Sequence, residues 1–311
     1  MSASPQVSQV SQAPLDRWAL SRALTRLANA DPMALARGPL RDPPAHAARR
    51  VGITGAPGAG KSTLVGHLAQ LRAPRGRLGV LAVDPSSPKS GGAILGDRVR
   101  MDELAGNAQL YIRSLGSRRT GDGLADNLPE MLDLMDSFGF DEVLLETVGV
   151  GQAEHAVRAQ VDTMVLVLLP DSGDIVQAMK AGIMEMADIF VVHKSDLPGA
   201  QRMATDIRRI AAMARHAADD WIPPILLSAA SQPASVQALS DTIDRHQAWH
   251  AQAPRVRALG RARRARYRLQ RLLELRIGQF IAQQDDAFFD APIAEQLARA
   301  VAALPHAEEA A

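Results

Sequence analysis

The stretch Gly55-Ala56-Pro57-Gly58-Ala59-Gly60-Lys61-Ser62 lies between a short apolar run, residues 50–54, and a helical pattern that begins at Thr63. Its glycines let the backbone turn so that successive N–H groups point at one anion, and the following helix N-terminus adds positive partial charge. Lys61 is then placed to bridge β- and γ-phosphates, and the Ser62 hydroxyl to coordinate Mg²⁺. Residues 55–63 are therefore predicted to form a phosphate-binding loop.

Short apolar runs alternate with longer helical patterns on either side of this loop. Each run is too short for a helix and is rich in Val, Ile and Leu, as is typical of strands covered on both faces. Their alternation predicts an α/β P-loop fold, with a mostly parallel central sheet flanked by helices and ligands beyond the strands' carboxyl ends. The predicted strands are residues 50–54, 78–83, 110–112, 142–146, 164–169, 189–192 and 225–227.

Helical patterns extend the chain at both ends. Residues 15–30 predict an amphipathic helix, after which Pro43-Pro44 interrupts the pattern. Beyond residue 245 the strand signal stops, and two helices are expected, one at 255–284 and one at 292–304 with Pro292 in its first turn. We therefore expect an N-terminal helical extension (1–45), a P-loop domain (46–245) and a C-terminal helical arm (246–311).

The composition excludes several classes of protein. None of the 311 residues is cysteine, which rules out disulfides, zinc–thiolate sites and cysteine nucleophiles. The net charge of +1 favours neither nucleic acid nor membrane as partner. The first 14 residues lack an apolar signal core, so a cytoplasmic protein is expected. A transit peptide is the alternative, because Arg17, Arg22 and Arg26 lie on an acid-poor stretch with a helical pattern.

A second motif, His193-Lys194-Ser195-Asp196, follows the predicted strand 189–192. It matches the guanine-binding motif Asn-Lys-x-Asp except in its first residue. The Asp196 carboxylate can accept hydrogen bonds from N1–H and the 2-amino group of guanine, two donors that adenine lacks on that edge. His193 is expected to brace the loop, and the stretch Ser228-Ala229-Ala230 to offer a backbone contact to the guanine oxygen. These features predict GTP and GDP as ligands.

Acidic residues follow the ends of two predicted strands. Asp84 and Glu146 stand at such ends, and Asp97 lies in the glycine-rich stretch after the first of them. Carboxylate and hydroxyl oxygens suit Mg²⁺, so we expect these three acids to gather around an ion held by Ser62. Gly149 can offer its N–H to the γ-phosphate.

The residue after Gly149 is Val150, at the position where Ras-type GTPases carry the glutamine that orients the attacking water. We therefore expect slow intrinsic hydrolysis and a partner that completes the site. Lys61 and Glu146 are the expected catalytic residues, and Arg100 or Lys180 is the candidate for a further cation, with a surface ion pair as the alternative for each.

Four sequence stretches together make the chain resemble the MeaB/ArgK family. They are residues 55–63, residues 83–97, the string Glu146-Thr147-Val148-Gly149-Val150-Gly151-Gln152, and residues 178–185. Members of that family are G-protein chaperones of adenosylcobalamin-dependent acyl-CoA mutases, and they are related to the human methylmalonic aciduria type A protein. The resemblance covers roughly residues 15–280.

The resemblance implies several features that the residues alone do not give. Ser62 and Asp97 would bind Mg²⁺, with Asp84 and Glu146 in or beside its coordination shell. Residues near 89–104, 146–159 and 169–180 would be three nucleotide-sensitive switches, with Lys180 closing the third. The C-terminal helices would form a homodimer, and the partner would be a mutase, alone or with its adenosyltransferase.

The chain departs from the family pattern at His193, where asparagine is usual, and at Arg119, Asp122 and Asp171, where glycines are usual. Two other functions stay open: a nickel-insertion GTPase, which the scattered histidines and absent cysteine disfavour, and a kinase-like phosphotransferase, which the guanine motif disfavours. Residues 255–276 hold nine arginines, but these fall around the whole helix, so no nucleic-acid partner is expected.

Overall fold

The computed structural model describes residues 14–37, 47–85, 107–117, 124–125, 127–147, 153–170, 182–212 and 219–303. Contacts within the chain divide these residues into two compact units. One combines residues 14–29 with 47–252, and the other combines 30–37 with 253–303. The boundary predicted at residue 245 falls inside a helix that continues to Gln252, and the predicted domain limits stay predictions.

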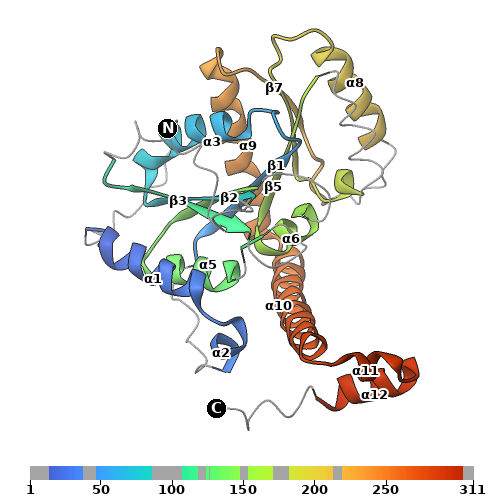
Figure 1. Cartoon of the computed structure of the whole chain (residues 1–311). Coiled ribbons are helices and arrows are strands. Elements are labelled where there is room, and N and C mark those ends of the chain that lie inside the picture. Colours follow the sequence, from blue (N-terminus) through green and yellow to red (C-terminus); the bar gives the residue numbers. More distant parts are fainter. Residues whose placement is uncertain are drawn as a thin grey trace. The chain divides into compact units, whose positions relative to one another are not determined.

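The first unit contains a seven-stranded sheet in the order β3-β2-β4-β1-β5-β6-β7 (Figure 1). Every neighbouring pair of strands is parallel. All seven predicted strands are confirmed, and β3 is longer than predicted because its pairing with β2 continues through polar residues as far as Ser117. The strands are β1 (Arg49–Gly55), β2 (Leu78–Pro85), β3 (Leu110–Ser117), β4 (Glu142–Thr147), β5 (Thr163–Leu168), β6 (Ile189–His193) and β7 (Ile225–Ser228).

Helices cover both faces of this sheet, as the α/β pattern predicts (Figure 1). On one face lie α3 (Lys61–Arg72) and α9 (Pro233–Gln252). On the other lie α6 (Ala153–Gln160), α8 (Ala200–Ala211) and α5 (Leu128–Ser137), and α1 (Arg17–Asn29) packs against α5. Short 3₁₀ turns occur at Ala73–Arg75 and Ile183–Glu185.

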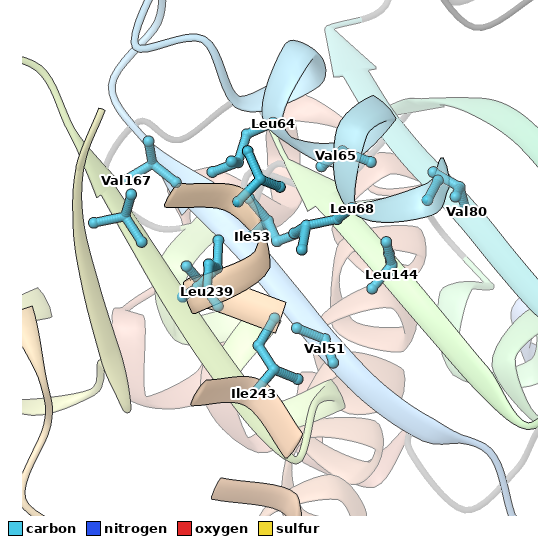
Figure 2. Packing of buried hydrophobic residues seen from close by; sticks show 14 of the residues in the cluster. Val51, Ile53, Leu64, Val65, Leu68, Val80, Leu144, Val167, Leu239 and Ile243 are labelled. Atoms are coloured by element: carbon cyan, nitrogen blue, oxygen red, sulfur yellow. The ribbon is translucent and has the colours of Figure 1, made fainter. Parts of the chain in front are cut away.

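The larger core lies between the sheet and the helices α3 and α9. Figure 2 shows Leu64 and Leu68 of α3 packed with Ile53 of β1, and Ile243 of α9 beside Val51. All five side chains are fully buried or nearly so. This packing holds α3, and with it the phosphate loop at its N-terminus, against the central strand.

A buried ion-pair network closes the opposite end of the sheet. Arg72 donates to both oxygens of Glu142, at 2.6 and 2.8 Å, and to Asp244 at 2.7 Å. These bonds join α3 to β4 and α9. A cavity of about 310 Å³ at this end is lined by arginines and also by carboxylates. These carboxylates partly neutralise the positive charge of the arginines, which favours a structural role for the arginines over anion binding.

The second unit is helical and contains α2 (Pro32–Arg37), α10 (Pro254–Ala282), α11 (Asp286–Asp290) and α12 (Ile293–Ala302). The two predicted C-terminal helices are confirmed, except that Pro292 has extended backbone and precedes the first helical residue. Helix α11 was not predicted because its five residues are too few to show a periodic pattern. No helix within the described ranges is long and apolar enough to cross a membrane.

Gly52 on β1 is required by the close approach of α6. A Cβ atom at this position would lie 2.7 Å from Val157 Cγ1 and 3.1 Å from Val161 Cγ2. Both neighbours are β-branched residues at the C-terminal end of α6 or just after it, so they adjust poorly. The absence of a side chain at Gly52 therefore fixes how closely α6 packs on the central strand.

We predict that Gly52→Ala lowers the free energy of unfolding by about 1–3 kcal/mol, because the added methyl group overpacks this contact. The matched control is Gly66→Ala on α3, where a Cβ atom meets nothing within 4 Å; it should be neutral or stabilising. Urea denaturation of the wild type and both variants measures these free energies of unfolding. A Gly52→Ala variant as stable as the wild type would contradict the close approach of α6 to β1.

Candidate functional site

The phosphate loop connects the central strand directly to a buried helix. Gly55 ends β1 and Lys61 begins α3. The Lys61 ammonium group donates to the backbone oxygens of Gly55 at 2.8 Å and Ala56 at 3.0 Å, and the Ala59 N–H donates to Ala56 O at 3.2 Å. The strand–loop–helix context required of the motif is therefore present, with the N-terminus of α3 opening onto the loop.

The predicted guanine-binding stretch lies against this loop. Gly60 has a φ of +89°, and a Cβ atom there would lie 2.7 Å from Cδ2 of His193. Lys194 donates from Nζ to Gly58 O at 2.9 Å. The histidine therefore packs on the loop backbone at the position where asparagine is usual, which is the bracing contact that the sequence analysis expected of it.

His193 is held as a neutral imidazole. Its side chain is 1% exposed, and burial, followed by the nearby charges of Lys194 and His67, lowers its pKa. A neutral ring can pack against Gly60 without placing a third cation beside Lys194 and Lys61. This leaves the positive charge of the loop on its lysines.

The two predicted guanine-contacting loops meet at the end of the sheet. His193 pairs in register with Ser228, and Ser195 donates its N–H to Ser228 O at 2.9 Å. The Ala229 N–H donates to Ser235 Oγ at 3.2 Å. Asp196 is exposed, so its carboxylate is accessible to a purine base.

Two of the predicted magnesium-site residues are in contact. Ser62 donates from Oγ to Glu146 Oε1 at 2.6 Å. In the sheet register Glu146 lies between Ile53 and Ala82, and Asp84 follows two positions beyond Ala82. Only the backbone of Asp84 is described. Within the described ranges, no three His, Asp or Glu side chains gather closely enough to hold a metal ion by themselves.

The remaining predicted site residues lie outside the described parts of the chain. These are Asp97, Arg100, Gly149 and Lys180. The predicted first switch, 89–104, also lies wholly outside, and the second and third do so in part. For all of these, the sequence-based roles stay predictions.

The sequence analysis missed one charged residue, Glu154, in the first turn of α6. Its side chain is 3% exposed, and its pKa is raised by burial, against the opposing effects of a hydrogen bond from its own backbone N–H and of the charges of His155 and Lys61. An acidic residue in the first turn of a helix ordinarily complements the helix dipole at the surface. For that reason nothing in the local sequence distinguishes Glu154 from a solvated residue.

The chain matches one protein family and is similar in sequence to individual known proteins. Residues 20–285 match the family model described as methylmalonyl-CoA mutase-associated GTPase MeaB. A predicted GTPase of Caulobacter vibrioides is 40% identical over 74% of this chain and 73% of its own length. The mitochondrial methylmalonic aciduria type A homolog of Mus musculus is 40% identical, over 62% of this chain and 48% of the mouse protein.

Among solved structures, one described as an LAO/AO transport system kinase shares the fold. Its TM-score is 0.64 at 22% identity, and the match covers 89% of this chain and 91% of that one. At this level of identity the likeness concerns the fold alone.

We predict that Gly60→Ala weakens binding of guanine nucleotides by at least about ten-fold, because the methyl group strains a left-handed residue and displaces His193. Calorimetric titration with GDP measures the loss. Gly66→Ala, which adds the same methyl group to open space one turn and a half into α3, should bind GDP like the wild type. Unchanged affinity in the Gly60 variant would contradict the contact between the two loops.

Proposed function

We propose that this chain, which belongs to the MeaB family of methylmalonyl-CoA mutase-associated GTPases, is the GTP-dependent chaperone of an adenosylcobalamin-dependent acyl-CoA mutase. The chain is a P-loop GTPase, as the family, its GTPase relatives and the fold agree. The observation that carries the proposal is the family match itself, which begins within α1 and continues beyond the end of α10. It therefore includes α2 and α10 of the helical unit as well as the nucleotide site.

In this proposal the phosphate loop binds GTP and GDP and the loops after β6 and β7 select guanine. Lys61 lies at the end of the loop with its ammonium group directed to the loop carbonyls, where β- and γ-phosphate oxygens can replace or join those acceptors. Asp196 supplies the carboxylate that distinguishes guanine from adenine, and Lys194 both braces Gly58 and carries the stem that covers the base.

Mg²⁺ is the proposed metal cofactor. The hydroxyl of Ser62 and the carboxylate of Glu146 lie 2.6 Å apart at the nucleotide end of the sheet, and this oxygen pair fits the ligand preference of Mg²⁺. Asp84 and Asp97 are the proposed further ligands, directly or through water. Bound there, the ion would neutralise charge on the β- and γ-phosphates during transfer.

Hydrolysis is proposed to be slow until the mutase binds. Val150 stands where the water-orienting glutamine of Ras-type enzymes stands, so the chain by itself does not supply that group. Arg100 and Lys180 are the proposed cations of the completed site, Lys180 by way of the third switch. Cycling between nucleotide states would then gate cofactor loading and protect the mutase. We place this chain in the cytoplasm with the mutase, alone or together with the adenosyltransferase of that mutase.

We predict that a cobalamin-dependent acyl-CoA mutase accelerates GTP hydrolysis by this protein. A correctly placed cation is worth about 10³–10⁵ in rate in characterised GTPases, and stimulation of that kind should be seen in single-turnover assays with and without the mutase. Lys180→Ala should keep intrinsic hydrolysis and lose most of the stimulation. Fast intrinsic turnover that no such mutase alters would refute the chaperone role while leaving the GTPase assignment intact.

A homodimer through the helical unit is the proposed assembly. Four apolar side chains at four-residue spacing on α10 are 37–60% exposed, and three on α12 are 55–77% exposed. Spacing of this kind places each set along one side of its helix, and exposed apolar stripes of this length mark interaction sites. A second copy offers the same stripe, as a twofold interface requires. The residues are Leu269, Leu273, Ile277 and Ile281 on α10, and Ile293, Leu297 and Val301 on α12.

We predict that the double variant Leu273→Glu with Ile277→Glu is monomeric, because two buried charges would face their own copies across the interface. Light scattering after size-exclusion chromatography measures the mass. Gln279→Glu, at an exposed position on another side of α10, should leave the dimer intact. A wild-type protein that is monomeric at all concentrations would exclude this assembly.

A further inference from the structure

Trp18 is an exposed tryptophan on α1. It is 69% exposed, and within the described residues its indole N–H has no hydrogen-bond acceptor. The other two tryptophans of the chain, Trp221 and Trp249, are partly buried and donate their N–H groups to backbone oxygens at 2.7 and 3.1 Å. Packing within the described part of the chain therefore does not account for Trp18.

The apolar side of α1 is already used by the fold. Leu20, Leu24 and Leu27 are buried, and α1 lies against α5 (Figure 1). In a helix of about 3.6 residues per turn these leucines share one side, and Trp18 and Arg22 fall on the opposite side. Trp18 is thus an apolar residue at the centre of the side that faces solvent.

Two arginines continue this side of the helix. The guanidinium carbon of Arg22 lies 4.1 Å from the centre of the Trp18 ring, and Arg26 follows four residues later; both arginines are exposed. Neither forms an ion pair with another described residue, and no residue of α1 is acidic. Spacing by four places all three side chains in one row. We call Trp18, Arg22 and Arg26 the Trp18 surface.

Helix α1 is fixed to β3, which is an edge strand of the sheet. The guanidinium group of Arg17 donates to Leu110 O at 2.7 Å and also to Asn107 O. The predicted first switch, residues 89–104, leads directly into this part of the chain. A protein that binds on α1 would therefore lie beside the strand to which the predicted switch connects.

We propose that the Trp18 surface is a docking site for the mutase, through a patch of that protein that carries carboxylates and an acceptor for the indole N–H. Charge complementarity supports this partner chemistry, because α1 carries three arginines and no acid. Tryptophan and arginine are also the residue types most enriched where protein interfaces are strongest. This inference rests on the proposed function, since it names where the proposed partner binds.

A protein fits this surface better than the other anionic partners do. Nucleic acid is bound through many phosphate contacts, and the Trp18 surface offers two arginines. A helix that lies on a membrane buries its apolar side in the lipid, whereas the leucines of α1 are buried within the protein. An acidic protein surface needs only a few well-placed contacts around one aromatic side chain.

The test compares Trp18→Ala and Arg22→Gln with the wild type in single-turnover GTP hydrolysis, at increasing concentrations of a mutase that stimulates the wild type. We expect each substitution to raise the half-saturating mutase concentration by about ten-fold or more. The intrinsic rate, the affinity for GDP and the rate at saturating mutase should not change, because α1 lies outside the nucleotide-binding loops. Added salt should weaken the response of the wild type more than that of Arg22→Gln.

The matched control is Arg202→Gln, which removes one positive charge from an exposed position of α8 and should behave like the wild type. Trp18 and Arg22 are exposed, so both variants should keep the melting temperature of the wild type. If Trp18→Ala does not fold, Arg22→Gln tests the same surface.

The docking site is overturned if the mutase stimulates both variants at the same half-saturating concentration as the wild type, and the chaperone role would then stand. It is also overturned if the variants lose binding to a DNA duplex or to vesicles that contain phosphatidylserine, with their response to the mutase unchanged. A smaller mass of the variants in light scattering, again with an unchanged response, would instead assign the surface to contact between copies. If no mutase stimulates the wild type, the chaperone role itself fails and the docking site fails with it.

Discussion

The nucleotide site depends on β1, the central strand, being packed tightly on both faces up to the residue where the phosphate loop begins. Val51 and Ile53 face α3 and α9, while Gly52 between them allows α6 to approach the opposite face. Alternation along the strand makes this possible, since successive side chains point to opposite faces. A loop that must hold its backbone N–H groups in fixed directions needs such a support, because any shift of the strand end would move every group that contacts phosphate.

The second requirement is that the loop be braced from β6. His193 packs against Gly60 and Lys194 donates to Gly58 O, so the elements predicted to recognise base and phosphate are in direct contact. The histidine that stands in place of the usual asparagine braces the loop by packing against Gly60. Burial lowers the pKa of His193, and the neutral ring avoids adding to the positive charge of the loop.

The helical unit presents a different kind of surface. The first unit buries its large apolar side chains in cores on both faces of the sheet, whereas α10 and α12 leave apolar stripes exposed. The nine arginines of residues 255–276 lie around α10, so this helix combines a soluble exterior with one apolar side. Such a division of surface suits the proposed role of this helix in assembly.

The sequence by itself determined the α/β class, the seven strands, the two long C-terminal helices and the phosphate loop. Each of these rests on short-range properties: apolar runs of strand length, helical periodicity, and glycine spacing within eight residues. The phosphate loop and the guanine motif together predicted the GTPase activity, and family resemblance added the proposed link to mutases. The short helix α11 and the extension of β3 were not foreseen, because five residues carry no periodic signal and because polar residues in β3 are held by pairing with β2.

Only the tertiary structure decided which of the candidate residues meet. Ser62 and Glu146 are 84 positions apart, and Lys194 and Gly58 are 136 apart. Their contacts follow from the order of strands in the sheet, which no local pattern encodes. The burial of Glu154 belongs to the same class of fact. An acid in the first turn of a helix is ordinarily solvated, but the tertiary packing of α6 buries this one and thereby raises its pKa.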